Sequence, residues 1–177
     1  MKSFISEDDI EQTLCTRLSQ PEFGWKRIEC DPSVEAQDDV SKTGRRNSSE
    51  CILPAVFLTA LERLNPQIDK SILAQVVADF RKDYTGKDMM DTNYKFYNYL
   101  RNGINVKVKK NGKDDFDIVR LIDFDNVENN DFHCVNQMWI KGRIRYRRPD
   151  VLLFVNGLQM VFIELKNSTV KIKEAYE

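Results

Sequence analysis

Two carboxylates and one ammonium group stand at the ends of two apolar segments late in the chain. Asp150 comes directly before the apolar run 151–155, and Glu164 and Lys166 follow a second run, 160–163. Facing carboxylates repel each other unless a cation lies between them, and hard oxygen ligands favour Mg²⁺ or Mn²⁺. Such an ion can activate a water and neutralise charge on a phosphate, and an ammonium can stabilise the negative charge that develops. The residues therefore predict a metal-dependent site that cleaves phosphodiester bonds.

A β-hairpin would bring these three side chains together. Asn156-Gly157 separates the two apolar runs, and this dipeptide is a strong hairpin signal because both residues tolerate a positive φ. Uninterrupted apolar runs are typical of strands covered on both faces. We therefore expect 150–155 and 158–166 to be adjacent antiparallel strands in the centre of a sheet.

The register of this hairpin decides where Asp150 points. A two-residue turn pairs odd-numbered with even-numbered residues, whereas Asp150 and Glu164 are both even. Because side chains alternate between faces, a regular hairpin would put these two carboxylates on opposite sides of the sheet. We therefore predict a β-bulge, a three-residue connection at Asn156-Gly157 or a marked twist. The alternative is a solvated hairpin end, with Glu164 and Lys166 as an ordinary surface pair.

A helix over 6–19 is predicted near the start of the chain. Ser6 and Asp9 have the spacing of a capping box. The apolar positions recur every four residues, at Ile10, Leu14 and Leu18. Glu11 lies about 100° from Ile10 around the helix axis and could reach a site in the sheet below. The alternative for Glu11 is an ordinary exposed position.

The middle of the chain reads as helices followed by strands. The polar stretch 29–50 is predicted to be a loop or a mobile insertion, in which Arg45-Arg46 could contact phosphate or remain a solvated pair. The expected helices are 54–64, 70–84 (with Ile72, Val76, Ala78 and Phe80 in the core) and a short aromatic one at 93–100. The expected strands are 104–109, 116–124 and 132–140. Asp123 and Asp125 follow a strand end and could imitate a site acid, but no Glu-x-Lys lies near them in the sequence.

A dense basic cluster occupies 141–148 and leads directly to Asp150. Its arginines are Arg143, Arg145, Arg147 and Arg148. A basic surface beside a metal site would attract a nucleic-acid backbone without reading its sequence. The alternative is a charged strand edge that resists aggregation.

Composition limits the remaining possibilities. The 177 residues suggest one domain, and the net charge of −1 means that any DNA binding must come from a local patch. No apolar run reaches the length of about 18 residues that a membrane helix needs, and the start lacks a secretory signal. Four scattered cysteines, Cys15, Cys30, Cys51 and Cys134, indicate buried thiols in a reducing cytoplasm. The single histidine, His133, has no second imidazole with which to bind a metal.

The hairpin resembles the PD-(D/E)xK nuclease signature, and the longer pattern is similar to the N-terminal domain of the motor (R) subunit of type I restriction enzymes. The resemblance runs in order along most of the chain. Its strings are Ser6–Glu11 with Gly24-Trp25, Leu61–Pro66, Leu121–Phe124, Asn129–Phe132, Val135–Gln137, Phe154–Gly157 and Glu164–Asn167.

The resemblance implies a fold, a set of site residues and a cofactor. The fold would be α/β, a restriction-endonuclease-like core with a central mixed β-sheet flanked by helices, over 1–177. Asp150 and Glu164 would bind Mg²⁺, the carbonyl of Leu165 would complete the metal shell, and Lys166 would be the catalytic lysine. The family's first-helix acid, which would be a further metal ligand, matches Glu11 best, with Glu7 as the alternative. The family's Gln-x-x-x-Tyr motif does not occur before Glu177.

The implied function is that of a Mg²⁺-dependent DNA endonuclease domain. Helicase-like motor domains that bind ATP would lie beyond residue 177. Residues 167–177 themselves are predicted to begin a helix, with Ser168 or Thr169 as its cap. The partners would be double-stranded DNA and the modification and specificity subunits, in the cytoplasm and with no membrane. The alternatives are another PD-(D/E)xK nuclease, such as a junction resolvase, and a non-catalytic DNA- or protein-binding module with a relic nuclease fold.

Overall fold

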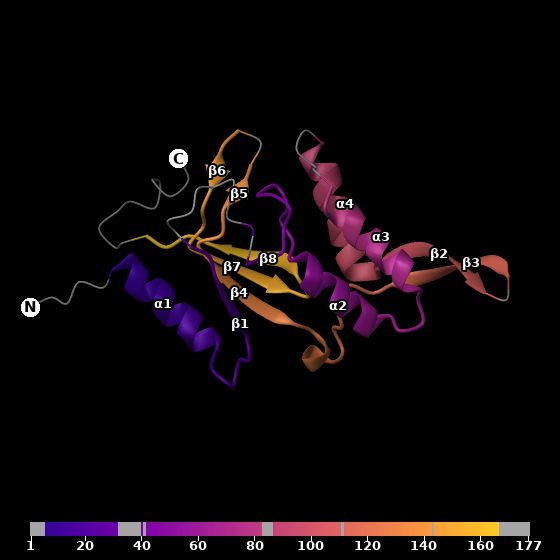
Figure 1. Ribbon diagram of the computed structural model, residues 1–177, viewed down its shortest axis with the longest axis horizontal. Coiled ribbons are helices and arrows are strands. Elements are labelled where there is room, and N and C mark those ends of the chain that lie inside the picture. The colour runs from indigo at the N-terminus through magenta and orange to yellow at the C-terminus, as the bar shows by residue number, and fades with distance from the viewer. Residues whose placement is uncertain are drawn as a thin grey trace, which may run out of the picture.

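The computed structural model describes residues 6–31, 40, 42–82, 87–110, 112–142 and 144–166. Its centre is a mixed sheet with the strand order β1-β4-β7-β8 (Figure 1). Strand β1 (Lys26–Glu29) runs parallel to β4 (Phe132–Asn136), and β7 (Val151–Val155) is antiparallel to both β4 and β8 (Leu158–Ile163). Helices flank this sheet, so the predicted α/β architecture is confirmed. It is consistent with a restriction-endonuclease-like core.

The other elements form two groups around the sheet. Helix α1 (Glu7–Leu18) packs on one face, where Cys15 contacts Cys134 and Val151. Helix α2 (Pro54–Leu64) lies over the other face, where Leu53 and Val56 meet Leu152 and Phe154. Helices α3 (Lys70–Phe80) and α4 (Met89–Asn102) and the ribbon of β2 (Ile104–Lys110) and β3 (Lys113–Val119) lie beyond α2 (Figure 1). A one-turn helix (Val127–Asn129) and the short pair β5 (Ile140–Lys141) and β6 (Tyr146–Arg147) complete the described elements.

Helix α1 has the predicted capping box, because Ser6 and Asp9 hydrogen-bond each other's backbone. Its buried face differs from the expected one. Glu11 and Cys15 are buried, whereas Ile10 is 39% exposed. Helix α1 therefore directs Glu11 toward the sheet, where the carboxylate accepts hydrogen bonds from polar side chains.

The predicted helices are present with altered ends. Helix α2 has the expected bounds, α3 ends at Phe80 rather than at residue 84, and α4 begins earlier than expected, at Met89. In α3, Leu73 and Val77 are buried, whereas Ala78 is exposed. Gly103 ends α4 as predicted. Its φ is 76°, and a Cβ there would lie 2.7 Å from the carbonyl oxygen of Val119.

Several strand predictions need correction. The second strand of the ribbon is 113–119 rather than 116–124, and the string 121–124 forms a loop rather than a central strand. The predicted strand 132–140 is interrupted after Asn136, because Gln137 adopts a left-handed backbone with φ 59°. Strand β1 was not predicted, since its four residues include one apolar side chain, Ile28.

The hairpin strands are adjacent and antiparallel as predicted, but only β7 is interior. Strand β8 is at the edge of the sheet and ends at Ile163. Met160, Val161 and Phe162 are 43%, 44% and 47% exposed. The expectation that both strands are central and buried is therefore wrong for β8.

The described part of the polar stretch 29–50 is packed against the domain rather than extended into solvent. Arg45 is 4% exposed and donates to Thr43 and to the carbonyls of Glu50 and Trp139. The carboxylate of Glu50 is buried and pairs with Arg46 and Arg81. Because Arg45 is buried, both predictions for it, a phosphate contact and a solvated residue, are wrong.

The described thiols are free, as expected. Cys15, Cys30 and Cys134 are buried, whereas Cys51 is exposed, which corrects its expected burial. None of the helices in the described ranges combines the length and apolar character needed to cross a membrane.

Candidate active site at the end of the hairpin

A β-bulge sets the alignment of the hairpin. Asn156 and Gly157 form a two-residue turn with φ of 50° and 78°, so Val155 pairs with Leu158. The register then shifts between Leu153 and Phe154. Beyond this point odd residues pair with odd residues, up to Val151 with Ile163. The predicted irregularity is confirmed as a bulge within β8, and it leaves Met160 without a pairing partner.

The turn of the hairpin is fixed in the core. The side chain of Asn156 accepts from the backbone N–H of Asp131 at 2.8 Å and donates to the carbonyl of Leu121 at 2.9 Å. A Cβ on Gly157 would lie 2.6 Å from the carbonyl oxygen of Leu53. The turn therefore needs glycine for both its backbone angles and its close packing.

The bulge places the two predicted acids opposite each other at the open end of the hairpin. Asp150 precedes Val151 and Glu164 follows Ile163, so the shifted register makes them the next facing positions. The backbone N–H of Leu165 donates to Oδ2 of Asp150 at 2.5 Å. The carboxylate of Asp150 therefore contacts the main chain between Glu164 and Lys166.

Lys166 belongs to the same group of charges. Its Nζ lies 3.3 Å from Oε1 of Glu164, and both side chains are about one-third exposed. The hydrogen bond to Glu164 raises the pKa of Lys166 above its usual value, against a smaller lowering by burial, and the charges of Glu164, Glu7 and Asp150 add to the rise. The ammonium is thus held in its charged form by three carboxylates.

The two candidate acids of α1 occupy different environments. Glu11 is 4% exposed, and its two oxygens accept hydrogen bonds from Asn136 Nδ2 at 2.9 Å and Gln137 Nε2 at 2.6 Å. Glu7, one turn earlier, lies close enough for its charge to act on Lys166. In Figure 1 the first turn of α1 lies near the end of the hairpin. The role of Glu11 as a metal ligand stays a prediction.

The donor set at the hairpin end suits a hard cation. Within the described ranges, no group of three or more His, Cys, Asp or Glu side chains is arranged to hold a metal ion. A divalent ion here would therefore rest on the carboxylates of Asp150 and Glu164 and on main-chain oxygen such as the carbonyl of Leu165. Oxygen donors of this kind fit Mg²⁺ and Mn²⁺.

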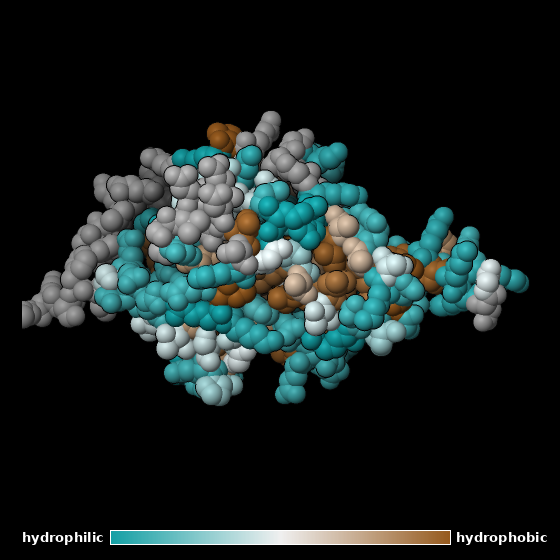
Figure 2. All heavy atoms as spheres, in the orientation of Figure 1, coloured by the Kyte–Doolittle hydropathy of each residue, from teal (hydrophilic) through white to brown (hydrophobic). Residues whose placement is uncertain are grey.

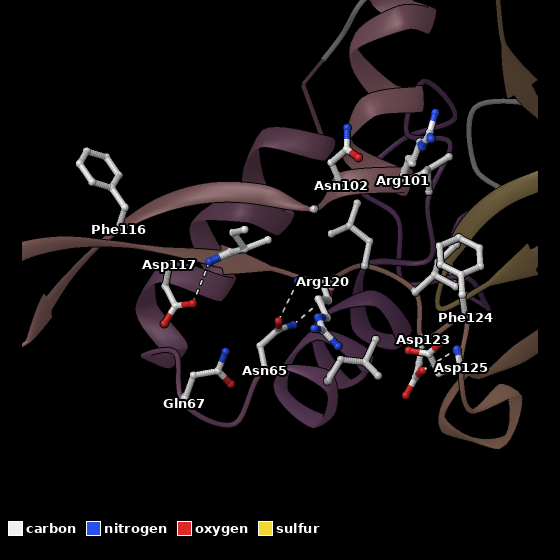
Figure 3. A pocket seen from close by; sticks show the side chains of 16 residues that line it. Asn65, Gln67, Arg101, Asn102, Phe116, Asp117, Arg120, Asp123, Phe124 and Asp125 are labelled. Carbon is white, nitrogen blue, oxygen red and sulfur yellow. Dashed lines mark hydrogen bonds between the residues drawn. The ribbon is translucent and has the colours of Figure 1, made fainter.

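Asp123 and Asp125 lie elsewhere. The carboxylate of Asp123 accepts from the backbone N–H groups of Asp125 and Asn126 and so stabilises a turn. Both acids line a hollow of about 760 Å³ between the end of α2, the end of α4 and β3, whose lining includes none of Asp150, Glu164 and Lys166 (Figure 3). They do not contribute to the hairpin site.

The basic cluster forms the segment that enters β7. Arg145, Arg147 and Arg148 are exposed, and Arg143 lies outside the described residues. The guanidinium of Arg148 lies 5.3 Å from the centre of the Trp139 ring. Two residues separate Arg147 from Asp150, so positive charge directly adjoins the site.

The comparisons with known proteins identify the family of this chain. The family model described as "Type I restriction enzyme R protein N terminus" matches residues 4–177. The chain belongs to this family.

Two relatives of this chain are named as endonuclease subunits of type I restriction enzymes. The chain is 37% identical over 165 residues to the type I restriction enzyme HindI endonuclease subunit of Haemophilus influenzae. The aligned region covers 92% of this chain and 15% of that protein. It is 31% identical over 140 residues to a Methanocaldococcus jannaschii protein named for a type I restriction enzyme MjaIXP endonuclease subunit, covering 75% of this chain and 13% of that protein. The chain thus spans about one-seventh of the length of these relatives.

Asn136 and Gln137 are neighbours of the site that residue types alone did not reveal. Gln137 donates its backbone N–H to the carbonyl of Asp150 at 3.0 Å, and both side chains bind Glu11. These amide side chains are uncharged, so they did not stand out as candidate site residues. Their partner, Glu11, lies more than 100 residues away in the sequence. The adjacent pair of amides at a strand end was the one available signal.

Proposed function

We propose that this chain is the Mg²⁺-dependent endonuclease domain of a type I restriction enzyme R subunit. The observation that carries the proposal is the bulged hairpin, which brings Asp150 against the main chain between Glu164 and Lys166. Membership of the R protein family supports a restriction endonuclease over another nuclease such as a junction resolvase. The gathering of Asp150, Glu164 and Lys166 at one hairpin end supports catalysis over a non-catalytic relic.

Asp150, Glu164 and the carbonyl of Leu165 would hold the Mg²⁺ ion, and Glu11 would support it from α1. When bound, Mg²⁺ supplies a Lewis acid that lowers the pKa of a water and neutralises charge on the phosphate. The N–H of Leu165 fixes Oδ2 of Asp150, and no described residue donates a hydrogen bond to the other oxygen, which keeps its lone pairs for a metal ion. This contact orients the carboxylate before substrate arrives.

Lys166 would stabilise the negative charge that develops on the phosphate. Its ammonium lies 3.3 Å from Glu164, and its raised pKa keeps it protonated. A preorganised positive charge lowers the barrier because it needs no rearrangement when the charge develops. Lys166 could also position the attacking water through an N–H donor.

Arg145, Arg147 and Arg148, with Arg143, would hold the backbone of double-stranded DNA beside the cleavage site. All three described arginines are exposed on the segment that leads to Asp150. Guanidinium groups bind phosphates through paired N–H donors, and such contacts do not read sequence. Choice of the DNA site would then belong to a separate specificity subunit.

The rest of the R subunit would supply the motor. We infer that residues 1–177 form its N-terminal endonuclease domain and that ATP-binding, helicase-like domains translocate DNA before cleavage. The relatives are about seven times longer than this chain, which leaves room for such domains. The modification and specificity subunits would be the protein partners, in the cytoplasm.

The test uses the assembled restriction enzyme that contains this chain. Cleavage of circular DNA and ATP hydrolysis are measured together, with Mg²⁺ and with EDTA, for Asp150→Ala and Glu164→Ala. We expect either substitution to reduce cleavage by at least about 100-fold. ATP hydrolysis should stay nearly intact, because both acids belong to the proposed nuclease site and not to the proposed ATP-binding domains. Asp125→Ala is the matched control, since this exposed acid lies away from the hairpin end. Cleavage that survives in either variant would remove that acid from the site.

A further inference from the structure

Gln137 adopts a backbone conformation that glutamine seldom takes. Its φ is 59°, and among described non-glycine residues only Asn156 shares a positive value. Asn156 forms a hairpin turn, where asparagine tolerates this region. Gln137 follows strand β4 and belongs to no such turn. A left-handed non-glycine residue costs free energy and persists only where surrounding contacts hold it in place.

The contacts that hold Gln137 join α1 to Asp150, the residue that precedes β7. Its backbone N–H donates to the carbonyl of Asp150 at 3.0 Å. Its side chain donates from Nε2 to Oε2 of Glu11 at 2.6 Å. One residue therefore binds both the candidate site acid Asp150 and the buried acid of α1.

Asn136 completes this arrangement from the preceding position. Its Nδ2 donates to the other oxygen of Glu11 at 2.9 Å, and it pairs with Val151 across the sheet. Asn136 is 2% exposed, and its Oδ1 has no hydrogen-bond partner among the described residues. A buried polar atom without a partner is costly, so stability alone does not explain this choice of residue.

A buried carboxylate that is hydrogen-bonded by two amides also contributes little to the stability of the fold. Replacing buried charged and polar groups with apolar residues is often neutral or stabilising. Glu11 is 4% exposed, and it lies on the side of α1 whose Cys15 packs against Cys134 and Val151 of the sheet. The use of a carboxylate here favours a role in placing another group, and that group is Asp150.

We propose that Gln137 is a positioning residue, which together with Glu11 fixes the backbone of Asp150 so that its carboxylate meets Glu164 and the N–H of Leu165. This inference rests on the proposed function of the hairpin end. Gln137 touches no reacting atom in this scheme. Glu11 acts on the backbone of Asp150 through Gln137, whose Nε2 donates to Oε2 of Glu11, while Asn136 donates to Oε1.

The test compares Gln137→Gly and Gln137→Asn with the unchanged protein. Glycine and asparagine both tolerate the left-handed backbone, so the N–H bond to Asp150 can form, but neither side chain reaches Glu11. Mn²⁺ binding is measured by electron paramagnetic resonance on the 177-residue chain, together with its thermal midpoint. DNA cleavage by the assembled enzyme is measured across a range of Mg²⁺ concentrations.

We expect both variants to bind Mn²⁺ about 10–100-fold more weakly, since partners that orient a ligand carry that much of the affinity. Cleavage should fall at limiting Mg²⁺ and recover at high Mg²⁺, with the thermal midpoint unchanged. Asn156→Gly is the control, because it changes the other left-handed residue at the far end of β7. Its thermal midpoint should fall, as Asn156 loses buried hydrogen bonds, while its Mg²⁺ dependence stays that of the unchanged enzyme.

Three results would overturn the proposal in distinguishable ways. Unchanged Mn²⁺ affinity and cleavage in both Gln137 variants would show that Asp150 needs no such support. A lowered thermal midpoint with cleavage that Mg²⁺ does not restore would show that Gln137 is structural only. A failure of the unchanged chain to bind Mn²⁺, or cleavage that survives Asp150→Ala, would overturn the proposed metal site and this inference with it.

Discussion

At the scale of single residues, the hairpin end is an arrangement of charges rather than a cavity. The carboxylate of Asp150 receives a main-chain N–H, and the ammonium of Lys166 lies against Glu164. The two acids and the lysine are partly exposed, which leaves them open to a large substrate such as a duplex. Chemistry at this site would depend on orientation and charge, not on enclosure.

Lys166→Ala should separate catalysis from metal binding. We expect cleavage by the assembled enzyme to fall by about 100–1000-fold, the usual loss when one group that stabilises developing charge is removed. Mn²⁺ binding to the chain should be retained or strengthened, because a positive charge leaves the vicinity of Asp150 and Glu164. Equal losses of Mn²⁺ affinity and cleavage would instead make Lys166 a structural partner of Glu164.

The raised pKa of Lys166 leads to a prediction about the pH dependence of cleavage. The ammonium stays protonated through neutral and mildly alkaline pH, because the folded site favours its charged form. Any loss of cleavage between about pH 7 and pH 9 should therefore persist in Lys166→Arg, whose guanidinium does not titrate there. A pH profile that flattens in the arginine variant would show that Lys166 itself loses its proton in that range.

At the scale of elements, one extra residue in β8 decides the alignment of the site. Deletion of Met160 should restore a regular hairpin, in which Glu164 and Lys166 turn to the face opposite Asp150. Cleavage by the assembled enzyme should then be lost, whereas Met160→Ala keeps the residue count and should remain within a few-fold of the unchanged enzyme. Circular dichroism of the two chains tests that both fold. An active, folded deletion variant would contradict the importance of the bulge.

The buried carboxylate of Glu50 ties the segment 42–51 to α3. Burial raises its pKa, but hydrogen bonds from Arg81 and Arg46 lower the pKa by more, so it lies below the ordinary 4.5. The stability from this ion pair is present above that ordinary value and is lost as the pH falls through the lowered pKa. Glu50→Gln should cost about 1–3 kcal/mol at pH 7 and much less in strong acid. Urea unfolding of the chain at both pH values measures this, and an equal loss at both would exclude the charge as the cause.

The sequence predicted the hairpin and its irregularity because both depend on local rules. Asn156-Gly157 specifies the turn, and counting odd and even positions requires a bulge before Asp150 and Glu164 can meet. The position of the bulge could not be predicted from the sequence, because Met160 is apolar like the other residues of the run 160–163. Burial of Glu11 and Arg45 was also missed, because both depend on partners contributed by β4 or by the loop that follows it.

At the scale of the whole molecule, apolar surface gathers beside the edge of the sheet. Figure 2 shows apolar residues across the middle of one face, among hydrophilic surroundings. A hollow of about 440 Å³ lies there between β8, α3 and α4, and its lining includes Phe96, Leu158 and Met160. In the described part of the chain, no strand pairs along the outer edge of β8 beyond the bridge at Leu158.

An open apolar edge strand favours self-association of the chain. Phe162→Lys should reduce association at high concentration, because a charged side chain on an edge strand opposes strand pairing between copies. Sedimentation velocity of the 177-residue chain measures this, with Phe162→Leu as the control that keeps apolar character. Equal association in the lysine variant would place the contact on another surface.

The bulge also limits how the gene for this hairpin can change in length. Each codon gained or lost between Asp150 and Glu164 turns the second acid to the other side of the sheet, and a second such change turns it back. Single-codon insertions and deletions there should inactivate the enzyme, and paired ones should spare it where the turn still closes. Length variation in this hairpin is therefore expected in steps of two codons.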